Sequence, residues 1–516
     1  MTKKLLKSSS IFVLMTLISR ILGFIRDIVA ASLFGTGPGY DAFVLSFRIP
    51  NLMRRLFAEG AFLQAFIPVL SEYRLKETHK DVRQFVSYVT GNLGLILLIV
   101  SVFGVLETPF IIKVFAPGFS KGDVRIHIAS EMLRITFPYI MFISLTALAS
   151  GILNIYGRFA ATAFSPVFLN ISIISASLYL SEHCTIPEKS LAWGVALAGI
   201  LQLGFMLFFV KQERLLVCPK INWHDPGVRQ VLTLMLPAVF GAAVSQINFF
   251  IDTLFASFLS NGSFSWLYYS DRLMEFPLGV FGIGIATVML PQLSSQYSTH
   301  SEAAFSATLD WGIRNVLLIG VPSAIGMYVL AGPLLATLFQ SGRFLPKDVW
   351  MSTKSLMAYA LAVIGIMLVK ILSTAFYARR DIRTPVQISV CTGIINILLN
   401  TFLIVPLAHV GLAISTSVTV LCNAIMLWLV LVRRGLYKRK SGWQTFMVRL
   451  GIANGTLYTI MALIVPDLEL WISWPSKTRI YCLLPLIGFG VVIYIGILLI
   501  VGLRPKDLII LTYKNS

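Results

Sequence analysis

Charged residues, acidic ones above all, are scarce in this sequence, and their scarcity excludes most soluble folds. Asp, Glu, Lys and Arg make up 13% of the 516 residues, whereas a soluble domain averages about 25%. There are 23 acidic residues against 42 basic ones, which gives a formal net charge of +19. The five cysteines show no CxxC or metal-ligand spacing, so neither a disulfide framework nor a zinc site is expected.

Catalytic motifs are missing as well. The sequence contains no GxxxxGK[ST] phosphate loop, no zinc motif and no recognisable catalytic triad, and its six histidines are scattered. We therefore expect neither an enzyme nor a bound cofactor. A basic soluble protein would suggest nucleic acid as a partner. Here the basic residues lie mostly between apolar runs, so no nucleic-acid partner is expected.

Long apolar runs fill the rest of the chain. The sequence is 57% hydrophobic, its mean hydropathy is +0.82, and runs of about 18 residues or more recur throughout. A helix satisfies its own backbone hydrogen bonds inside a bilayer, so the sequence predicts an all-α polytopic membrane protein. We predict fourteen transmembrane helices, at 9–34, 40–71, 84–107, 127–153, 161–181, 190–210, 230–258, 264–296, 311–335, 353–377, 384–405, 409–432, 443–465 and 479–502.

The distribution of basic residues predicts the orientation. About 24 Lys and Arg fall in the connections on the side of both termini, and about eight fall on the other side. Cytoplasmic loops carry the excess of positive charge. Both termini are therefore expected in the cytoplasm, and the protein is expected in the cytoplasmic (inner) membrane of a bacterium.

The chain also resembles itself. RDIVAASLFG at 26–35 is similar to IDTLFASFLS at 251–260, and IPVLSEY at 67–73 is similar to LPQLSSQY at 290–297. Repeats in the same order at a near-constant offset predict two pseudo-symmetric six-helix lobes, as in alternating-access transporters. The predicted domains are an N-terminal lobe at 1–223, a C-terminal lobe at 224–436, and two extra helices at 437–516.

The second predicted span carries five charges in an otherwise apolar stretch: Asp41, Arg48, Arg54, Arg55 and Glu59. Each charge costs about 2.5–3.5 kcal/mol at a bilayer centre unless it faces protein or water. All but Arg54 share one helical stripe, and Pro50 is expected to kink the helix. The stretch is expected to form one wall of a cationic chamber.

The first and eighth predicted spans add further charge to this set. Ser19 and Arg26 are seven residues apart in the first span, as are Arg20 and Asp27, and the eighth span places three charges within one turn: Asp271, Arg272 and Glu275. One interpretation is internal ion pairing, with the pairs Arg20–Asp27, Arg55–Glu59 and Arg272–Glu275.

Arginines outnumber acids in this set, which favours an anionic substrate. The planar guanidinium binds phosphate with two parallel hydrogen bonds. We expect Arg26, Arg54 and Arg272 to hold a phosphorylated substrate, with Arg20 nearby. A cation-coupled multidrug exporter would need an acidic cavity, and a non-transporting scaffold would not need so many charges inside the membrane.

A second constellation combines oxygen ligands. Asp252 lies in the seventh span, Asn396 and Asn400 share a face of the eleventh, and Thr416 lies early in the twelfth. Such oxygens suit Na⁺, but we favour hydrogen bonds between helices over a sodium site. The sequence leaves Na⁺ and the membrane potential as candidate energy sources.

Several segments together resemble the MurJ (MviN) family of bacterial lipid II flippases. The most specific are RRLFAEGAF at 54–62 and DRLMEFP at 271–277, supported by SRILGFIRDIVAASLFG at 19–35 and FYARRDIRTPV at 376–386. The resemblance covers the first twelve spans. The family belongs to a superfamily that also contains MATE multidrug exporters and polysaccharide-lipid flippases.

The resemblance implies a flippase for the undecaprenyl-pyrophosphate disaccharide-pentapeptide called lipid II, with a role in peptidoglycan synthesis. It implies that the two extra helices form a groove for the lipid tail, and that membrane lipids and cell-wall synthesis proteins are candidate partners. A flippase for another polyprenyl-pyrophosphate glycan remains the alternative. The family's important positions correspond to residues already singled out, with Ser19 beside them: Arg20, Arg26, Asp41, Arg54, Glu59, Arg272 and Glu275.

Overall fold

A computed structural model of the chain describes residues 3–55, 62–119, 123–279 and 283–503. Every regular element in these ranges is a helix, as the apolar composition predicts. The chain divides into two compact units, Met1–Ser265 and Trp266–Ser516. The predicted lobe boundary at 223/224 came from the internal repeat and stays a prediction.

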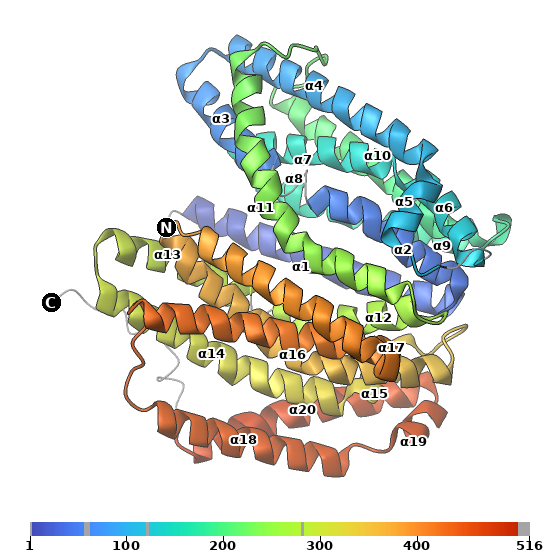
Figure 1. The fold of residues 1–516 in the computed structure, drawn as a ribbon, viewed down its shortest axis with the longest axis vertical. Coiled ribbons are helices and arrows are strands. Elements are labelled where there is room, and N and C mark those ends of the chain that lie inside the picture. Colours follow the sequence, from blue (N-terminus) through green and yellow to red (C-terminus); the bar gives the residue numbers. More distant parts are fainter. Residues whose placement is uncertain (1–2, 56–61, 120–122, 280–282, 504–516) are drawn as a thin grey trace. The chain divides into compact units, whose positions relative to one another are not determined.

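The first unit is a bundle that combines helices of very different length (Figure 1). Helix α10 packs against α7 and α9, α2 against α6, and α3 against α11. Its helices are α1 (Lys3–Phe34), α2 (Pro38–Met53), α3 (Leu63–Lys76), α4 (His79–Leu106), α5 (Thr108–Phe115), α6 (Val124–Thr136), α7 (Tyr139–Ile155), α8 (Phe159–Phe164), α9 (Pro166–Tyr179), the short 3-10 helix η2 (Ser181–His183), α10 (Lys189–Gln212) and α11 (Pro226–Ala256).

The second unit is built around α16, which packs against α13, α14 and α17. Helices α18 and α20 lie beside each other on its α14 side (Figure 1). The unit contains most of α12 (Ser263–Pro277), then α13 (Ile283–Ser298), α14 (Glu302–Val329), α15 (Ala331–Phe339), α16 (Pro346–Ala378), α17 (Arg383–Arg433), α18 (Trp443–Ile464), α19 (Leu468–Ser473) and α20 (Ser476–Ile500).

One helix is interrupted where the sequence predicts a break. The kink expected at Pro50 stays a prediction: Pro50 lies inside α2, and residues 56–61 lie outside the described ranges. The backbone of α17 leaves helical geometry at Ala408, with φ 48° and ψ −128°. Because α17 would otherwise be far longer than a bilayer is thick, this turn divides it into the two predicted spans at 384–405 and 409–432.

Within the described ranges, nine helical segments are long and apolar enough to cross a membrane. Helices α6 and α7, which are separated only at Phe137–Pro138, together form one of these segments. Helix α17 also counts once, although its turn at Ala408 gives it two arms. This architecture agrees with the predicted all-α polytopic class.

A buried carboxylate fastens α18 to the second unit. Asp310 of α14 is 2% exposed. It accepts hydrogen bonds from the Tyr437 hydroxyl at 2.8 Å and the Trp443 indole at 2.6 Å. The Arg314 Nε lies 2.8 Å from its other oxygen, and the guanidinium covers the Trp443 ring. The start of α18 is therefore held by one charged group, which sequence reasoning did not single out.

Candidate functional site

Arg26 of α1 is the centre of a buried polar cluster. Its guanidinium bonds Asp27 Oδ1 through Nε and Nη2, at 3.0 and 2.7 Å, and Asn170 Oδ1 of α9 through Nη1 at 3.2 Å. Asn170 in turn donates to the Ser19 backbone carbonyl at 2.9 Å. Arg26 is 6% exposed. The cluster thus joins three of the predicted residues through Asn170, which the sequence analysis missed.

Arg20 is not part of that cluster. Its side chain is exposed, and it makes no ion pair or hydrogen bond with any residue that the structure describes. The alternative pairing of Arg20 with Asp27 is therefore wrong, because Asp27 pairs with its neighbour Arg26. A buried carboxylate next to a buried guanidinium satisfies both charges locally, which leaves the Arg20 charge at the surface of the first unit.

The arginines of the second predicted span have neutral partners. Arg54 donates from Nε and Nη2 to Asn51 Oδ1, at 3.0 and 2.8 Å. Arg48 donates to Thr253 Oγ1 at 3.2 Å and lies over the Phe249 ring. Arg55 is exposed and also lies over that ring, with 5.8 Å from Cζ to the centroid. Their positive charge is consequently not cancelled by these contacts.

Glu59 lies outside the described residues, so the predicted Arg55–Glu59 pair stays a prediction. In the second unit, Arg272 and Glu275 do form the predicted pair, with Nη1 and Oε2 3.2 Å apart. Both side chains are only half-buried. The Arg272 guanidinium also lies over Tyr268, 5.6 Å from the ring centroid. An exposed pair of this kind is weak, so its arginine can exchange the carboxylate for another anion at little cost.

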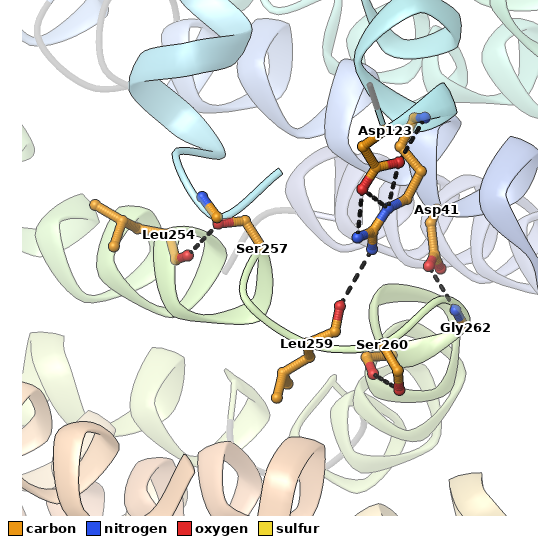
Figure 2. Close-up of polar contacts among 10 residues, drawn as sticks. Asp41, Asp123, Leu254, Ser257, Leu259, Ser260 and Gly262 are labelled. Carbon is orange, nitrogen blue, oxygen red and sulfur yellow. Dashed lines mark hydrogen bonds and ion pairs between the residues drawn. The ribbon is translucent and has the colours of Figure 1, made fainter. Parts of the chain in front are cut away.

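Asp41 is fully buried and binds the start of α12 (Figure 2). Its carboxylate accepts the backbone N–H of Gly262 at 2.6 Å and of Ser265 at 2.9 Å, and the Ser265 hydroxyl at 2.5 Å. Gly262 has φ 95°, a conformation that favours glycine. The carboxylate therefore acts as a helix N-cap supplied from another helix. Asp41 was predicted beside the substrate, and that stays a prediction; its contacts in the first unit are with Gly262 and Ser265.

A second set of contacts holds the connection between α11 and α12. Arg125 forms a two-pronged ion pair with Asp123, and its Nη1 donates to the Leu259 carbonyl at 3.3 Å (Figure 2). The Gly118 N–H donates to Ser257 Oγ at 2.9 Å. A Cβ on Gly118 would come within 2.6 Å of the backbone at Ser257. Sequence reasoning did not single out Arg125, because nothing in its local sequence indicated this distant contact.

The proposed sodium ligands make hydrogen bonds within their own helices and between the two arms of α17. Asn396 donates to Ser415 Oγ at 3.3 Å, Asn400 donates to Asn396 Oδ1 at 3.0 Å, and Thr416 donates to the Leu412 carbonyl at 2.9 Å. Asp252 lies in α11 of the first unit. The bonds between the arms are those that the favoured interpretation expects. No cluster of three or more His, Cys, Asp or Glu suited to a metal occurs in the described ranges.

In the first unit these residues form a region rich in positive charge. Five arginines (Arg20, Arg26, Arg48, Arg54 and Arg55) accompany three described carboxylates, those of Asp27, Asp41 and Asp252. Asp27 pairs with Arg26, and Asp41 accepts hydrogen bonds from Gly262 and Ser265. Arginines therefore outnumber acids here, and a guanidinium can bind an oxyanion through two parallel hydrogen bonds. The chemistry available is therefore binding of phosphate or carboxylate rather than bond cleavage.

Comparisons with known proteins agree with this chemistry. The family model described as "Lipid II flippase MurJ" matches residues 30–473. The "Probable lipid II flippase MurJ" of Vibrio cholerae is 44% identical over 516 residues, with 98% of each chain covered. The "Lipid II flippase MurJ" of Burkholderia cenocepacia is 40% identical over 439 residues and covers 84% of this chain and 85% of its own length.

Solved structures show the same fold. A "Lipid II flippase MurJ, inward closed conformation" matches with a TM-score of 0.79 and 25% identity, covering 94% of this chain and 97% of its own. An inward-facing MATE family multidrug transporter of the MOP superfamily matches with a TM-score of 0.68 and 14% identity, covering 83% and 98%. At that identity the second match shows the fold alone.

Proposed function

The chain belongs to the MurJ family of lipid II flippases, and on that basis we propose that it moves lipid II from the cytoplasmic to the outer leaflet of the membrane. It is a multi-pass membrane transporter of the MOP superfamily. The observation that carries the proposal is the relationship to the Vibrio cholerae protein, which extends over 98% of both chains. The substrate is a polyprenyl-pyrophosphate carrying a disaccharide and a pentapeptide.

We propose fourteen transmembrane helices. The nine apolar segments would supply ten spans because α17 turns at Ala408. The other four would be α1, α2 with α3, α11, and α12 with α13. Two six-helix lobes, 1–223 and 224–436, would carry the transport cycle, and 437–516 would hold the lipid tail. The excess of Lys and Arg on one side supports cytoplasmic termini in the inner membrane.

The arginines would bind the pyrophosphate. Arg54 and Arg272 would contact phosphate oxygens, Arg26 would do so by exchanging its Asp27 partner, and Arg20, which is exposed, would attract the headgroup. The supporting observations are the neutral acceptor Asn51 beside Arg54 and the half-buried pair of Arg272 with Glu275. Two hydrogen bonds from a guanidinium to a phosphate would replace these contacts.

The acids would keep the arginines and helices in place. Glu275 would hold Arg272 between transport events, and Glu59 would hold Arg55 in the same way. Asp41 would fix the start of α12. Ser19 would contribute through its carbonyl, which binds Asn170. During alternating access, each arginine would exchange its carboxylate partner for the substrate and back. The energy would come from the membrane potential or from Na⁺ bound at Asp252, Asn396, Asn400 and Thr416.

The test is leaflet-resolved measurement of lipid II in cells depleted of the protein. Rescue with the wild type should clear lipid II from the cytoplasmic leaflet, and Arg26→Ala should not, at equal membrane abundance. The matched control is Arg83→Ala, because Arg83 is exposed outside the charged region. Unchanged sidedness of lipid II on depletion would refute the proposal and favour another polyprenyl-pyrophosphate glycan, and drug efflux by the wild type would favour an exporter.

A further inference from the structure

A pocket of about 310 Å³ lies in the second unit where the ends of four helices meet. It is formed by the end of α13, the start of α14 and the residues that follow α16 and α17. These ends belong to the side that the charge distribution assigns to the cytoplasm. The pocket is lined by Gln296, Tyr297, His300, Ser301, Glu302, Phe305, Arg379 and Leu436, and we call it the Arg379 pocket.

Arg379 presents an unused guanidinium to this pocket. Its Cζ lies 4.9 Å from the centroid of the Tyr297 ring and 6.0 Å from that of Phe305. Among the described residues its side chain has no hydrogen-bond acceptor and no ion-pair partner. Aromatic contact restricts the orientation of the guanidinium, while its N–H groups remain available. An arginine held in this way is prepared to bind a carboxylate or phosphate.

Gln296 offers the complementary group. Its amide nitrogen donates to Thr308 Oγ1 at 2.8 Å. Its amide oxygen is buried and has no hydrogen-bond partner within the described part of the chain. Buried polar atoms are nearly always satisfied in native proteins, so this oxygen calls for an N–H or O–H donor from outside the fold.

The surrounding charges favour an anion. Arg380 and Arg383 are exposed beside the pocket. The nearest acid in that loop, Asp381, is already occupied: it accepts hydrogen bonds from Arg434 Nη1 at 2.8 Å and Thr384 Oγ1 at 2.7 Å. Glu302 at the pocket rim is exposed and makes no ion pair with Arg379.

We propose that the Arg379 pocket binds the carboxylate end of a peptide, with the carboxylate on Arg379 and a peptide N–H on the Gln296 amide oxygen. A fully ionised phosphate monoester or a phosphodiester has no N–H or O–H to donate to this oxygen, whereas the end of a peptide carries a donor and a carboxylate together. This inference rests on the proposed function, because the peptide would be the one carried by the lipid II headgroup. The pocket then docks that peptide on the cytoplasmic side, apart from the arginines proposed for the pyrophosphate.

Binding of soluble probes to the full-length protein in nanodiscs tests the inference. N-acetyl-D-alanyl-D-alanine is the probe, and its C-terminal methylamide and inorganic phosphate are the comparison ligands. We expect the free carboxylate to bind at least about ten-fold more tightly than the methylamide, because the methylamide cannot form a charged pair. Arg379→Gln should remove this preference, and Gln296→Met should weaken binding of the carboxylate several-fold.

The matched control is Arg380→Gln, which removes the same charge from the next residue without touching the pocket. It should leave the affinity within about two-fold. Equal loss in both variants would overturn the inference, since the effect would then be one of general charge. Competition by inorganic phosphate as effective as that by the peptide would also overturn it, since the site would then bind any oxyanion.

The two proposals can fail separately. If the wild type clears lipid II from the cytoplasmic leaflet but Arg379→Gln binds the peptide like the wild type, the pocket assignment is wrong and the function stands. If the peptide binds in an Arg379-dependent manner while depletion leaves lipid II unchanged, the pocket assignment stands and the substrate is another peptide-bearing molecule.

Discussion

The carboxylate of Asp41 accepts both the hydroxyl of Ser265, at 2.5 Å, and its backbone N–H, at 2.9 Å, across 224 residues of sequence. With the Gly262 N–H, it has three donors and no solvent exposure. A side chain from α2 thus completes the first turn of α12, and both residues belong to the first unit.

Asp41→Asn should destabilise the protein. An asparagine keeps the shape, but it removes the charge and turns one acceptor into a donor that faces an N–H group. Hydrogen bonds to charged groups contribute about 1.5–3 kcal/mol each, so we expect a loss of about 2–3 kcal/mol in the free energy of unfolding. Thermal unfolding in detergent measures it. Asp467→Asn, at an exposed position, is the control and should change little.

Arg272→Ala and Glu275→Gln should separate substrate binding from ion pairing. If Arg272 binds phosphate, Arg272→Ala abolishes clearance of lipid II from the cytoplasmic leaflet. Glu275→Gln keeps the arginine and loses only a half-buried pair, worth under about 1 kcal/mol, so clearance should persist within a few-fold. Equal loss in both variants at equal abundance would mean that the pair itself is what the protein needs.

Asp310→Asn should loosen the start of α18. Removing one partner of a buried ion pair costs about 3–5 kcal/mol, and here Tyr437 and Trp443 also lose their charged acceptor. We expect faster amide hydrogen exchange from residue 437 to the first turns of α18. Tyr437→Phe, which removes one donor, should give a smaller effect in the same segment. A uniform rise in exchange over the second unit would contradict this local role.

The Asp381–Arg434 pair should make a small contribution to stability that depends on pH. Partial burial raises the pKa of Asp381, but hydrogen bonds from Thr384 and the Arg434 guanidinium outweigh it and hold the pKa below its ordinary value of 3.8. A group with a lowered folded pKa stabilises above its unfolded pKa and loses that contribution as pH falls through the folded one.

The variant Asp381→Asn isolates this effect. It should be less stable than the wild type by under about 1 kcal/mol at neutral pH, and the difference should shrink below a pH of about 4. Unfolding midpoints across that range measure it. The double variant with Arg434→Gln should show no further loss; an additive loss would mean that the two residues do not interact.

Ala408→Gly should stabilise the turn in α17. Ala408 has φ 48° and ψ −128°, a conformation that costs a residue with a Cβ about 1–3 kcal/mol. Glycine adopts it freely, so the unfolding midpoint should rise. Ala413→Gly is the control, because the same substitution inside the helical second arm should have the opposite effect and lower stability by about 1 kcal/mol. A lower midpoint for Ala408→Gly would show that the position is not strained.

Sequence reasoning predicted the helical class, the break near 408, and the pair Arg272–Glu275. These depend on composition and on neighbours along one helix, which local sequence encodes. It assigned Asp27 to the wrong arginine. Asp27 is one residue from Arg26 and seven residues from Arg20, and both spacings allow contact. The choice depends on Asn170, 144 residues from Arg26.

Contacts between side chains and the backbone of distant loops could not be predicted from the sequence. Arg125 binds the Leu259 carbonyl, and every residue carries a carbonyl, so no residue type marks the partner. Asp310 was missed for a related reason. Its donors, Tyr437 and Trp443, are ordinary aromatic residues near a predicted helix end, and only the packing of α18 against α14 brings them to one carboxylate.

The loop between α11 and α12 is held chiefly through its main chain, at the Leu259 carbonyl and the Gly262 N–H. Phe258 and Asn261 in this loop are exposed, whereas Leu259 is buried. Substitutions at the two exposed positions can therefore accumulate while the attachment beneath stays intact. A library that randomises residues 258 and 261 should thus yield mostly functional proteins, whereas one that randomises Asp41 and Arg125 should not.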